Sequence, residues 1–229
     1  MHLADLNWMD VERYLAHDDR ILLITGATEQ HAYLSLLTDI KVPEAIAAAV
    51  ARQEGVLVAP PLNFGCSGHF MEYPGTISLT QEIFSLVLVD IVRSLMQHGF
   101  YGFLILNGHG GNAYPVELDD LAQEIDGMRI VWYEWWKDAA AQAIANEIGH
   151  TAEHANWSEN FPFTRVSEVP AAIKPRPQHD TFTSSGSSIS LRDIFGDGSF
   201  GGPYQVDDAI MQRLFDAVVA EARALLNTL

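Results

Sequence analysis

The chain has 229 residues, of which 48% are hydrophobic and 19% charged, enough to bury one substantial core or at most two small ones. Its 13 basic and 30 acidic side chains give a formal net charge of −17, which repels phosphate backbones and anionic lipid surfaces. We therefore expect neither nucleic acid nor a membrane as a partner. The single cysteine, Cys66, excludes an intrachain disulfide, and residues 1–5 lack a signal-peptide pattern, so we expect a cytoplasmic protein.

Short apolar runs alternate with segments of helical length along most of the chain. We predict, in order, a strand at Ile21–Ala27, a helix at Val42–Arg52 with Pro43 in its first turn, a strand at Val56–Pro60, a helix at Gln81–His98 capped by Thr80, a strand at Phe100–Leu106, a helix at Ala113–Ile125, a strand at Arg129–Trp136, and helices at Asp138–Ile148 and Asp207–Leu226. This alternation predicts an α/β fold with a mostly parallel sheet covered on both faces. The Pro-, Gly- and Ser-rich stretch Pro170–Pro203 predicts a loop. With no repeat and no linker, residues 1–229 are expected to form a single domain.

Unusual polar residues follow the predicted strands. Glu29 and His31 come directly after the first strand, two positions apart, so in an extended chain both side chains leave on the same side. With Asp39, from the loop expected before the next helix, they form half of a plausible metal site. The alternative is structural: Asp39 caps the helix at Val42 and Glu29 is solvated.

A second group follows the third strand. His109 lies among three glycines in Asn107–Asn112, which lets the backbone turn sharply and leaves the imidazole uncovered. Such a histidine is either a metal ligand or a side chain satisfied by hydrogen bonds, and Asn112 is a candidate N-cap of the following helix.

Three other chemistries compete for these segments. Gly108–Ala113 fits a loose dinucleotide pattern, with Glu134 available for a ribose. His150–His154 reads H-x-x-E-H, an inverted zinc-protease motif that needs a continuous helix. Cys66 and His69 are a candidate nucleophile and base, although a lone cysteine is more often a small buried hydrophobe.

Taken together, the motifs resemble the creatininase (creatinine amidohydrolase) family. The matching segments are GATEQH ending at His31 with Thr38-Asp39 after it, FGCSGH…EYPGTISL from Phe64 to Leu79, LNGHGGN from Leu106 to Asn112, EHANWSEN from Glu153 to Asn160, and the late SSG…GGP segment. Their order holds from about residue 20 to residue 215.

The resemblance implies a three-layer αβα sandwich, a homo-oligomer that is often a hexamer, and two divalent metal ions per chain. Glu29, Asp39 and His109 would hold one ion, and His31, the bridging Asp39 and a further carboxylate would hold the other. The donors are imidazole and carboxylate without thiolate, which suits Zn, Mn or Fe.

The sequence departs from the family pattern at three places. The family's carboxylate two residues after His109 is here Gly111, and Glu159 is the natural substitute. The interval from His31 to Asp39 is one residue shorter, with Ala32-Tyr33 in place of Gly-Pro. A Trp-Asp pair that flanks creatinine in the family is here His150-Thr151, so creatinine is not the expected substrate.

The resemblance also assigns residues to the reaction. His154 lies at an acid–base or substrate-contacting position, and Glu153 either orients it or is solvated. Ser67 and the backbone N–H of Gly110 match substrate-binding positions, and His69 is included by proximity.

These assignments predict a metal-dependent hydrolase that activates water against an amide-type C–N bond of a small molecule, a cyclic amide or a formamide. The alternatives are hydrolysis of a carbocyclic diketone such as a keto-inositol, and a non-catalytic, metal-stabilised family member. A phosphorylated substrate would need Arg or Lys near the site, but the candidate loops carry almost none, and Lys174 and Arg176 are the nearest in sequence. This favours an uncharged or sugar-like substrate. Trp132, Trp135 and Trp136 are expected in the core or at a subunit interface.

Overall fold

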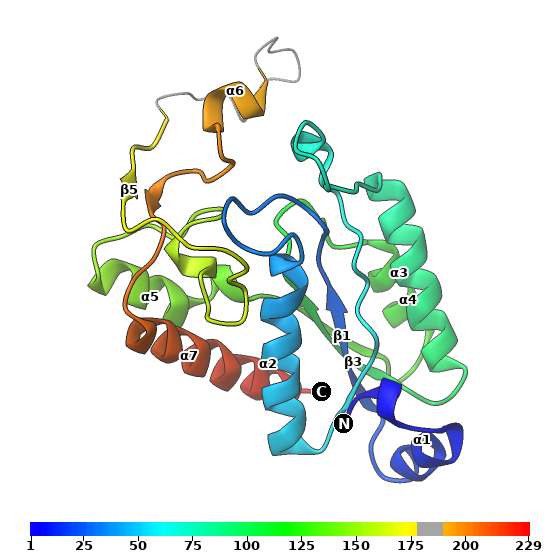
Figure 1. The fold of residues 1–229 in the computed structure, drawn as a ribbon. Helices are drawn as coiled ribbons and strands as arrows, with labels where there is room; N and C mark the ends of the chain where they lie inside the picture. The colour runs from blue at the N-terminus through cyan, green and yellow to red at the C-terminus, as the bar shows by residue number, and fades with distance from the viewer. Residues whose placement is uncertain (178–189) are drawn as a thin grey trace.

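A computed structural model describes residues 1–177 and 190–229 and centres on a four-stranded parallel sheet (Figure 1). The strands are β1 (Arg20–Thr25), β2 (Leu57–Val58), β3 (Gly102–Asn107) and β4 (Arg129–Glu134), in the order β2-β1-β3-β4. Five of the six residues of β1 and all six of β3 are buried, as expected for strands covered on both faces. Thr25 pairs with Asn107 and Asn107 with Glu134, so the carboxyl ends of these strands lie level at one edge.

Helices cover both faces of the sheet. The helices α2 (Thr38–Glu54), α5 (Ala139–Glu147) and α7 (Asp208–Leu226) pack on one face, and α3 (Gln81–Met96) and α4 (Glu117–Glu124) cover the other (Figure 1). The three-layer αβα sandwich is therefore confirmed. Short 3₁₀ turns lie at Leu3–Asp5, Gly68–Phe70, Trp135–Lys137 and Trp157–Glu159. No helix in the described ranges is long and apolar enough to cross a membrane.

Most predicted elements are present with shifted ends. Thr80 caps α3 by accepting a hydrogen bond from the Ile83 N–H, as predicted. The predicted helix at Ala113 begins only at Glu117, because Pro115 disfavours the helical conformation in the residue before it. The strand ending at Trp136 stops at Glu134. The helix α1 (Trp8–Leu15), capped by Asn7, was not predicted.

The start of α2 corrects two expectations. The helix begins at Thr38, four residues before the predicted Val42, because the Ser35 carbonyl accepts hydrogen bonds from both the N–H and the hydroxyl of Thr38. Asp39 therefore lies in the first helical turn, not in a preceding loop. Pro43 lies beyond the first turn, where it has no N–H to donate to the Asp39 carbonyl.

The segment 170–203 is not loop throughout. It contains a two-residue antiparallel pair, β5 (Ile173–Lys174) and β6 (Gly202–Pro203), and a short helix, α6 (Leu191–Phe195). The SSG motif of this segment, at 184–186, lies outside the described residues.

Candidate functional site

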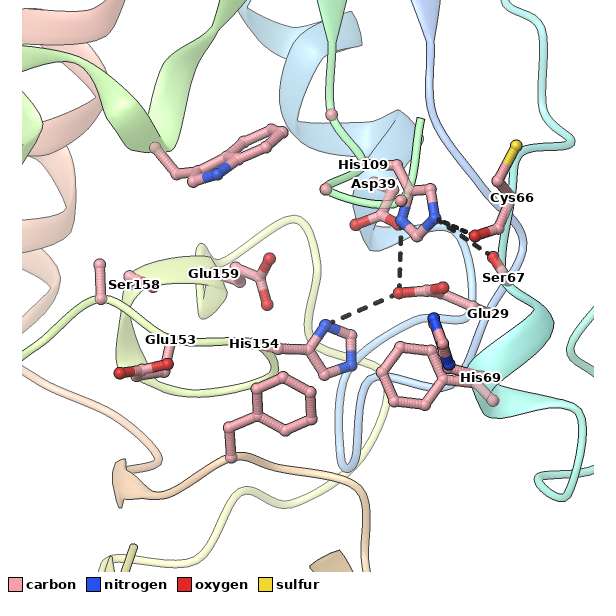
Figure 2. A pocket seen from close by; sticks show the side chains of 17 residues that line it. Glu29, Asp39, Cys66, Ser67, His69, His109, Glu153, His154, Ser158 and Glu159 are labelled. Atoms are coloured by element: carbon pink, nitrogen blue, oxygen red, sulfur yellow. Dashed lines mark hydrogen bonds and ion pairs between the residues drawn. The ribbon is translucent and has the colours of Figure 1, made fainter. Parts of the chain in front are cut away.

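A cavity of about 470 Å³ opens at the carboxyl ends of β1 and β3. Figure 2 shows acidic and histidine side chains from several segments pointing into it. Most of the residues named from the sequence line it: Glu29, Asp39, Ser67, His69, His109, Gly110, Glu153, His154 and Glu159. Ligands in open α/β folds bind at this edge of the sheet. The polar residues that follow the predicted strands lie at the same edge.

Two glycines bring α2 onto the strand ends. Gly26 follows β1 and Gly108 follows β3, and a Cβ atom at either position would overlap the backbone carbonyl of Asp39. Their lack of a side chain thus permits the close approach that places the first turn of α2, with its Asp39 carboxylate, against both strands.

The Asp39 carboxylate lies between two histidines. Its Oδ1 is 2.9 Å from His31 Nε2, and its Oδ2 is 2.9 Å from His109 Nδ1. All three residues are buried. One carboxylate thus faces both imidazoles from opposite oxygens, as a bridging ligand does.

Two further carboxylates complete the cluster. Glu29 Oε1 lies 3.5 Å from His109 Nδ1, and Glu159 Oε2 lies 3.8 Å from His31 Nε2. Possible ligand atoms of Glu29, Asp39 and His109 lie within 4.8 Å of one another, and so do those of His31, Asp39 and Glu159. The fold thus brings together the residues of the two ligand sets that the family resemblance implies.

In both His31 and His109, the ring nitrogen that faces away from Asp39 lies close to a backbone carbonyl oxygen. His31 Nδ1 lies 3.2 Å from the Glu29 carbonyl oxygen, and His109 Nε2 lies 3.2 Å from that of Cys66. In the neutral imidazole, an N–H donated to the carbonyl leaves a lone pair on the nitrogen that faces Asp39. This is the tautomer of a histidine that ligates a metal.

The donor set fits a divalent cation. Glu29 Oε2, His31 Nε2 and Asp39 Oδ2 are buried and make no hydrogen bond of suitable geometry within the described part of the chain; the 2.9 Å contacts of the latter two are with each other's side chains and His109. Leaving such atoms unpaired is costly, and so is burying several carboxylates without compensating positive charge. Cations bound between these atoms would satisfy both requirements, and imidazole with carboxylate suits Zn, Mn or Fe.

The protonation equilibria reflect this crowding. Burial lowers the pKa of His31, but the carboxylates of Asp39 and Glu159 outweigh it and raise that pKa to about 10. Burial opposes ionisation of Asp39, yet His31 and His109 hold its pKa below the usual range. Burial, helped by Asp39 and Glu29 against His31, raises the pKa of Glu159 to about 7. The carboxylates therefore stabilise a positive charge within the cluster, as the ligands of a cation do.

Asparagine side chains fix the loop that carries His109. Asn107 Oδ1 accepts hydrogen bonds from Thr25 Oγ1 at 3.1 Å and from Asn112 Nδ2 at 3.1 Å, and Asn107 Nδ2 donates to the His109 carbonyl at 2.8 Å. Asn112 Oδ1 also accepts from the Cys66 N–H at 3.0 Å. Asn112 is thus a buried strut between loops, and the interpretation as an N-cap is wrong.

His154 lies beside the cluster in an aromatic setting. Its ring stacks on Phe70 at 4.7 Å between centroids and is 4.9 Å from that of Phe200. Its Nδ1 is 3.6 Å from Glu29 Oε1. Burial and the neighbouring His31 lower the pKa of His154 to about 4, so its neutral form predominates near pH 7.

Glu153 does not contact the His154 ring in the way expected of an orienting group. Its carboxylate points away from that ring (Figure 2) and lies 2.9 Å from Arg176. Next to it, the Thr151 carbonyl accepts hydrogen bonds from Asn156 and Trp157. The residues that line the cavity here are Ala152 and Glu153, directly after the His150-Thr151 positions where the family pattern has a Trp-Asp pair.

The three expected substrate-binding residues all line the cavity but differ in their exposure to solvent. Ser67 is buried, with Oγ 3.5 Å from His109 Nε2, whereas His69 and Gly110 are exposed at the rim. A Cβ at Gly111 would overlap the Cys66 carbonyl and His109 Nε2, so this backbone has no room for a carboxylate side chain there. Glu159 faces the cluster from another loop.

The geometry disfavours the three competing chemistries. Residues 150–154 form no helix, so the zinc-protease interpretation of H-x-x-E-H is wrong. Cys66 Sγ donates to Gln81 Oε1 at 3.4 Å, and burial raises the pKa of its thiol, contrary to an activated nucleophile. The Glu134 carboxylate, assigned to a ribose in the dinucleotide alternative, pairs with Lys137 at 2.7 Å.

Sequence reasoning missed several residues of the site. Phe70, Trp136 and Phe200 supply the apolar wall of the cavity, and Asn107 holds the His109 loop. Gln30 contacts His154 and Gly198, which are 124 and 168 residues away in sequence. Its place between Glu29 and His31 was the one available signal.

Comparison with known proteins points to one family. Residues 4–226 match the family model for creatininase, described as creatinine amidohydrolase. A creatinine amidohydrolase from Pseudomonas putida is 30% identical over 160 residues, 64% of this chain and 62% of that protein. A mycofactocin precursor peptide peptidase from Mycolicibacterium smegmatis is 37% identical over 99 residues, 40% of each protein. A 3-dehydro-scyllo-inosose hydrolase from Thermotoga maritima is 26% identical over 145 residues, 60% of this chain and 47% of that protein.

Solved structures agree with the sequence relatives. A creatininase variant complexed with creatine has a TM-score of 0.79 at 25% identity, covering 99% of this chain and 98% of that one. A manganese form of creatininase has a TM-score of 0.78 at 25% identity, with the same coverage. By sequence, the chain matches 40 to 62% of the length of the three relatives above.

Proposed function

The chain belongs to the creatininase family, and on that premise we propose that it is a hydrolase with two divalent cations at the carboxyl edge of its sheet. The observation that carries the proposal is the convergence of three carboxylates and two histidines on one cavity, with buried atoms that no hydrogen bond satisfies. Glu29, Asp39 and His109 would hold one cation. His31, Asp39 and Glu159 would hold the other, with Glu159 in place of the carboxylate missing at Gly111.

Two cations bound there would supply Lewis acidity and lower the pKa of a water molecule toward neutrality. The protein's own residues do the rest. Asp39 would keep the His31 and His109 rings in place, with one carboxylate oxygen 2.9 Å from each. His154, neutral and facing the cluster through Nδ1, would stabilise the developing oxyanion and pass a proton to the leaving nitrogen. Phe70 and Phe200 pack against its ring.

The lining of the cavity supports a small uncharged substrate with an amide-type C–N bond. Its charged residues are the four carboxylates Glu29, Asp39, Glu153 and Glu159, and no Lys or Arg of the described residues lines it. Apart from the proposed cations, a phosphorylated or carboxylated substrate would find no Lys or Arg side chain to pair with. Trp136, Phe70 and Phe200 offer flat apolar surface to the rest of the molecule. Cyclic amides and formamides have these properties.

The non-catalytic alternative leaves His154 without a purpose. A purely structural metal site has no need of a neutral imidazole that faces the cluster from outside the two proposed ligand sets. Hydrolysis of a keto-inositol, the other alternative, has support from the Thermotoga relative, and keto-cyclitols therefore belong in any substrate panel.

Removal of metal tests the proposal directly. The purified protein, screened against cyclic amides, formamides, short peptides and keto-cyclitols, should hydrolyse at least one class. Dialysis against a chelator should abolish that activity, and added Zn²⁺ or Mn²⁺ should restore it, because the reaction depends on the bound ions. Turnover that survives complete metal removal would contradict the proposal.

A further inference from the structure

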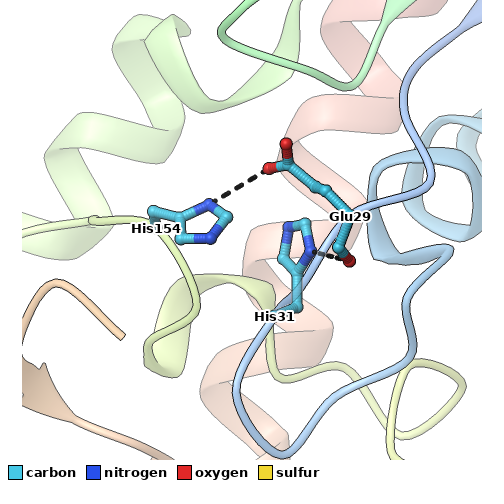
Figure 3. A group of neighbouring side chains, drawn as sticks. All are labelled: Glu29, His31 and His154. Carbon is cyan, nitrogen blue, oxygen red and sulfur yellow. Dashed lines mark hydrogen bonds and ion pairs between the residues drawn. The ribbon is translucent and has the colours of Figure 1, made fainter. Parts of the chain in front are cut away.

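Gln30 lies between two proposed metal ligands but points toward neither ion set. Its side chain is buried, with 5% of the residue exposed, and reaches across to the loop at Gly198 and to His154. The mechanism proposed above does not use it. Its contacts determine how His154, shown with Glu29 and His31 in Figure 3, presents itself to the cavity.

The orientation of the Gln30 carboxamide is fixed by two backbone partners. Oε1 accepts a hydrogen bond from the Ala32 N–H at 3.1 Å, and Nε2 donates to the Gly198 carbonyl at 3.2 Å. An N–H can only donate and a carbonyl oxygen can only accept, so the amide cannot be reversed without losing both bonds. Gly198 has a φ of +97°, and a Cβ there would overlap the amide, so the loop is shaped around this side chain.

The second hydrogen of the amide points at His154. Gln30 Nε2 lies 2.8 Å from His154 Nε2, and because Gln30 Nε2 has no lone pair to offer, the imidazole nitrogen must accept. The Gln30 backbone carbonyl also lies near that nitrogen, at 3.1 Å, and would favour a proton there. The amide contact is the shorter of the two, and it requires an unprotonated Nε2.

Aromatic rings pack around His154 and hold the orientation of its ring. Phe70 stacks on one side with an interplanar angle of 15°, and the ring centroids of Phe200 and His31 lie 4.9 Å and 4.4 Å away. In this packing the nitrogen that faces Gln30 is Nε2. A neutral imidazole with an unprotonated Nε2 carries its proton on Nδ1, the nitrogen that faces Glu29.

We propose that Gln30 is a positioning residue that holds His154 in the tautomer with its proton on Nδ1, directed at the cavity. The inference rests on the role proposed above for His154. It makes His154 a proton donor in the resting protein. The nearby set Glu29, His31 and His154 also has the spacing of a metal site, but a protonated Nδ1 has no lone pair for a cation. His31 and His109 differ, since the nitrogen of each that faces away from Asp39 lies 3.2 Å from a backbone carbonyl, which accepts a proton from that nitrogen.

The test is the tautomer itself, read from ¹⁵N spectra of the histidine rings in the full-length protein, with and without Zn²⁺. The His154 signals are those absent from His154→Asn. In the wild type we expect Nδ1 protonated and Nε2 not. In Gln30→Glu, a carboxylate replaces the donor, and we expect Nε2 to become protonated. Gly198→Ala, which displaces the amide without changing it, should also disturb the wild-type tautomer.

Gln123→Glu, on the exposed face of α4, is the matched control and should leave the His154 signals unchanged. With a substrate in hand, kcat of Gln30→Glu should fall about 10- to 100-fold, as for loss of a partner that orients a functional histidine, with KM little changed. A wild-type His154 protonated on Nε2 would overturn the inference whether or not any variant folds. The same inference survives if no substrate is found, because the tautomer is measured without turnover.

Discussion

Asp39→Asn is expected to remove both metal ions together and to reduce hydrolysis by at least about 100-fold. This loss exceeds that for a residue that only hydrogen-bonds to a metal ligand, which is about 10- to 100-fold. The carboxylate lies 2.9 Å from His31 on one oxygen and 2.9 Å from His109 on the other. An amide keeps the shape but turns one oxygen into an N–H₂ group, which cannot ligate a cation. Metal content by plasma mass spectrometry, measured beside activity, checks both parts.

Asp90→Asn, on the exposed side of α3, makes the same chemical change away from the cavity and should leave metal and activity at wild-type levels. Circular dichroism separates loss of metal from loss of fold, since α2 is anchored by its apolar face as well as by Asp39. Two ions retained in folded Asp39→Asn would exclude this carboxylate as a bridge.

His154→Asn is expected to separate metal binding from turnover. Its ring lies outside the two proposed ligand sets, so metal content should stay at the wild-type level. Turnover should fall by about 10²- to 10⁴-fold, the range for a positioned acid–base group. Kinetics at saturating substrate, together with metal analysis of the same preparation, measure both quantities.

His98→Asn, in an exposed position after α3, is the matched control for the histidine change. Loss of metal from His154→Asn would place this residue among the ligands, in the set it forms with Glu29 and His31. Unchanged turnover would remove it from the reaction altogether.

The position of the site was predictable because polar residues follow apolar strands, and parallel strands bring their ends to one edge. Glu29, His31, His109 and the αβα layers follow from that rule and from the family resemblance. The start of α2 did not, because Pro43 suits a first turn and the Ser35 contacts that begin the helix earlier leave no signal in hydrophobic pattern. The error moved Asp39 from a loop into the helix without removing it from the site.

The parts that sequence missed depend on contacts between distant segments. Gln30 reaches His154 and Gly198 across most of the chain. Asn112 joins its own loop to Gly26 and Cys66, donating to the Gly26 carbonyl and accepting from the Cys66 N–H, instead of capping a helix. The short pair β5–β6 lacks the apolar run that identifies β1 or β3. The single domain, the cytoplasmic location and the hexamer stay predictions.

The most direct test of the account is the number of metal ions per chain in the wild type and in Glu159→Ala, purified side by side without chelator. The account predicts close to two ions in the wild type and close to one in the variant, because Glu159 Oε2 faces only the His31 side of the cluster. A wild type that binds no metal, even after titration with Zn²⁺ or Mn²⁺, would contradict the proposed hydrolase centre.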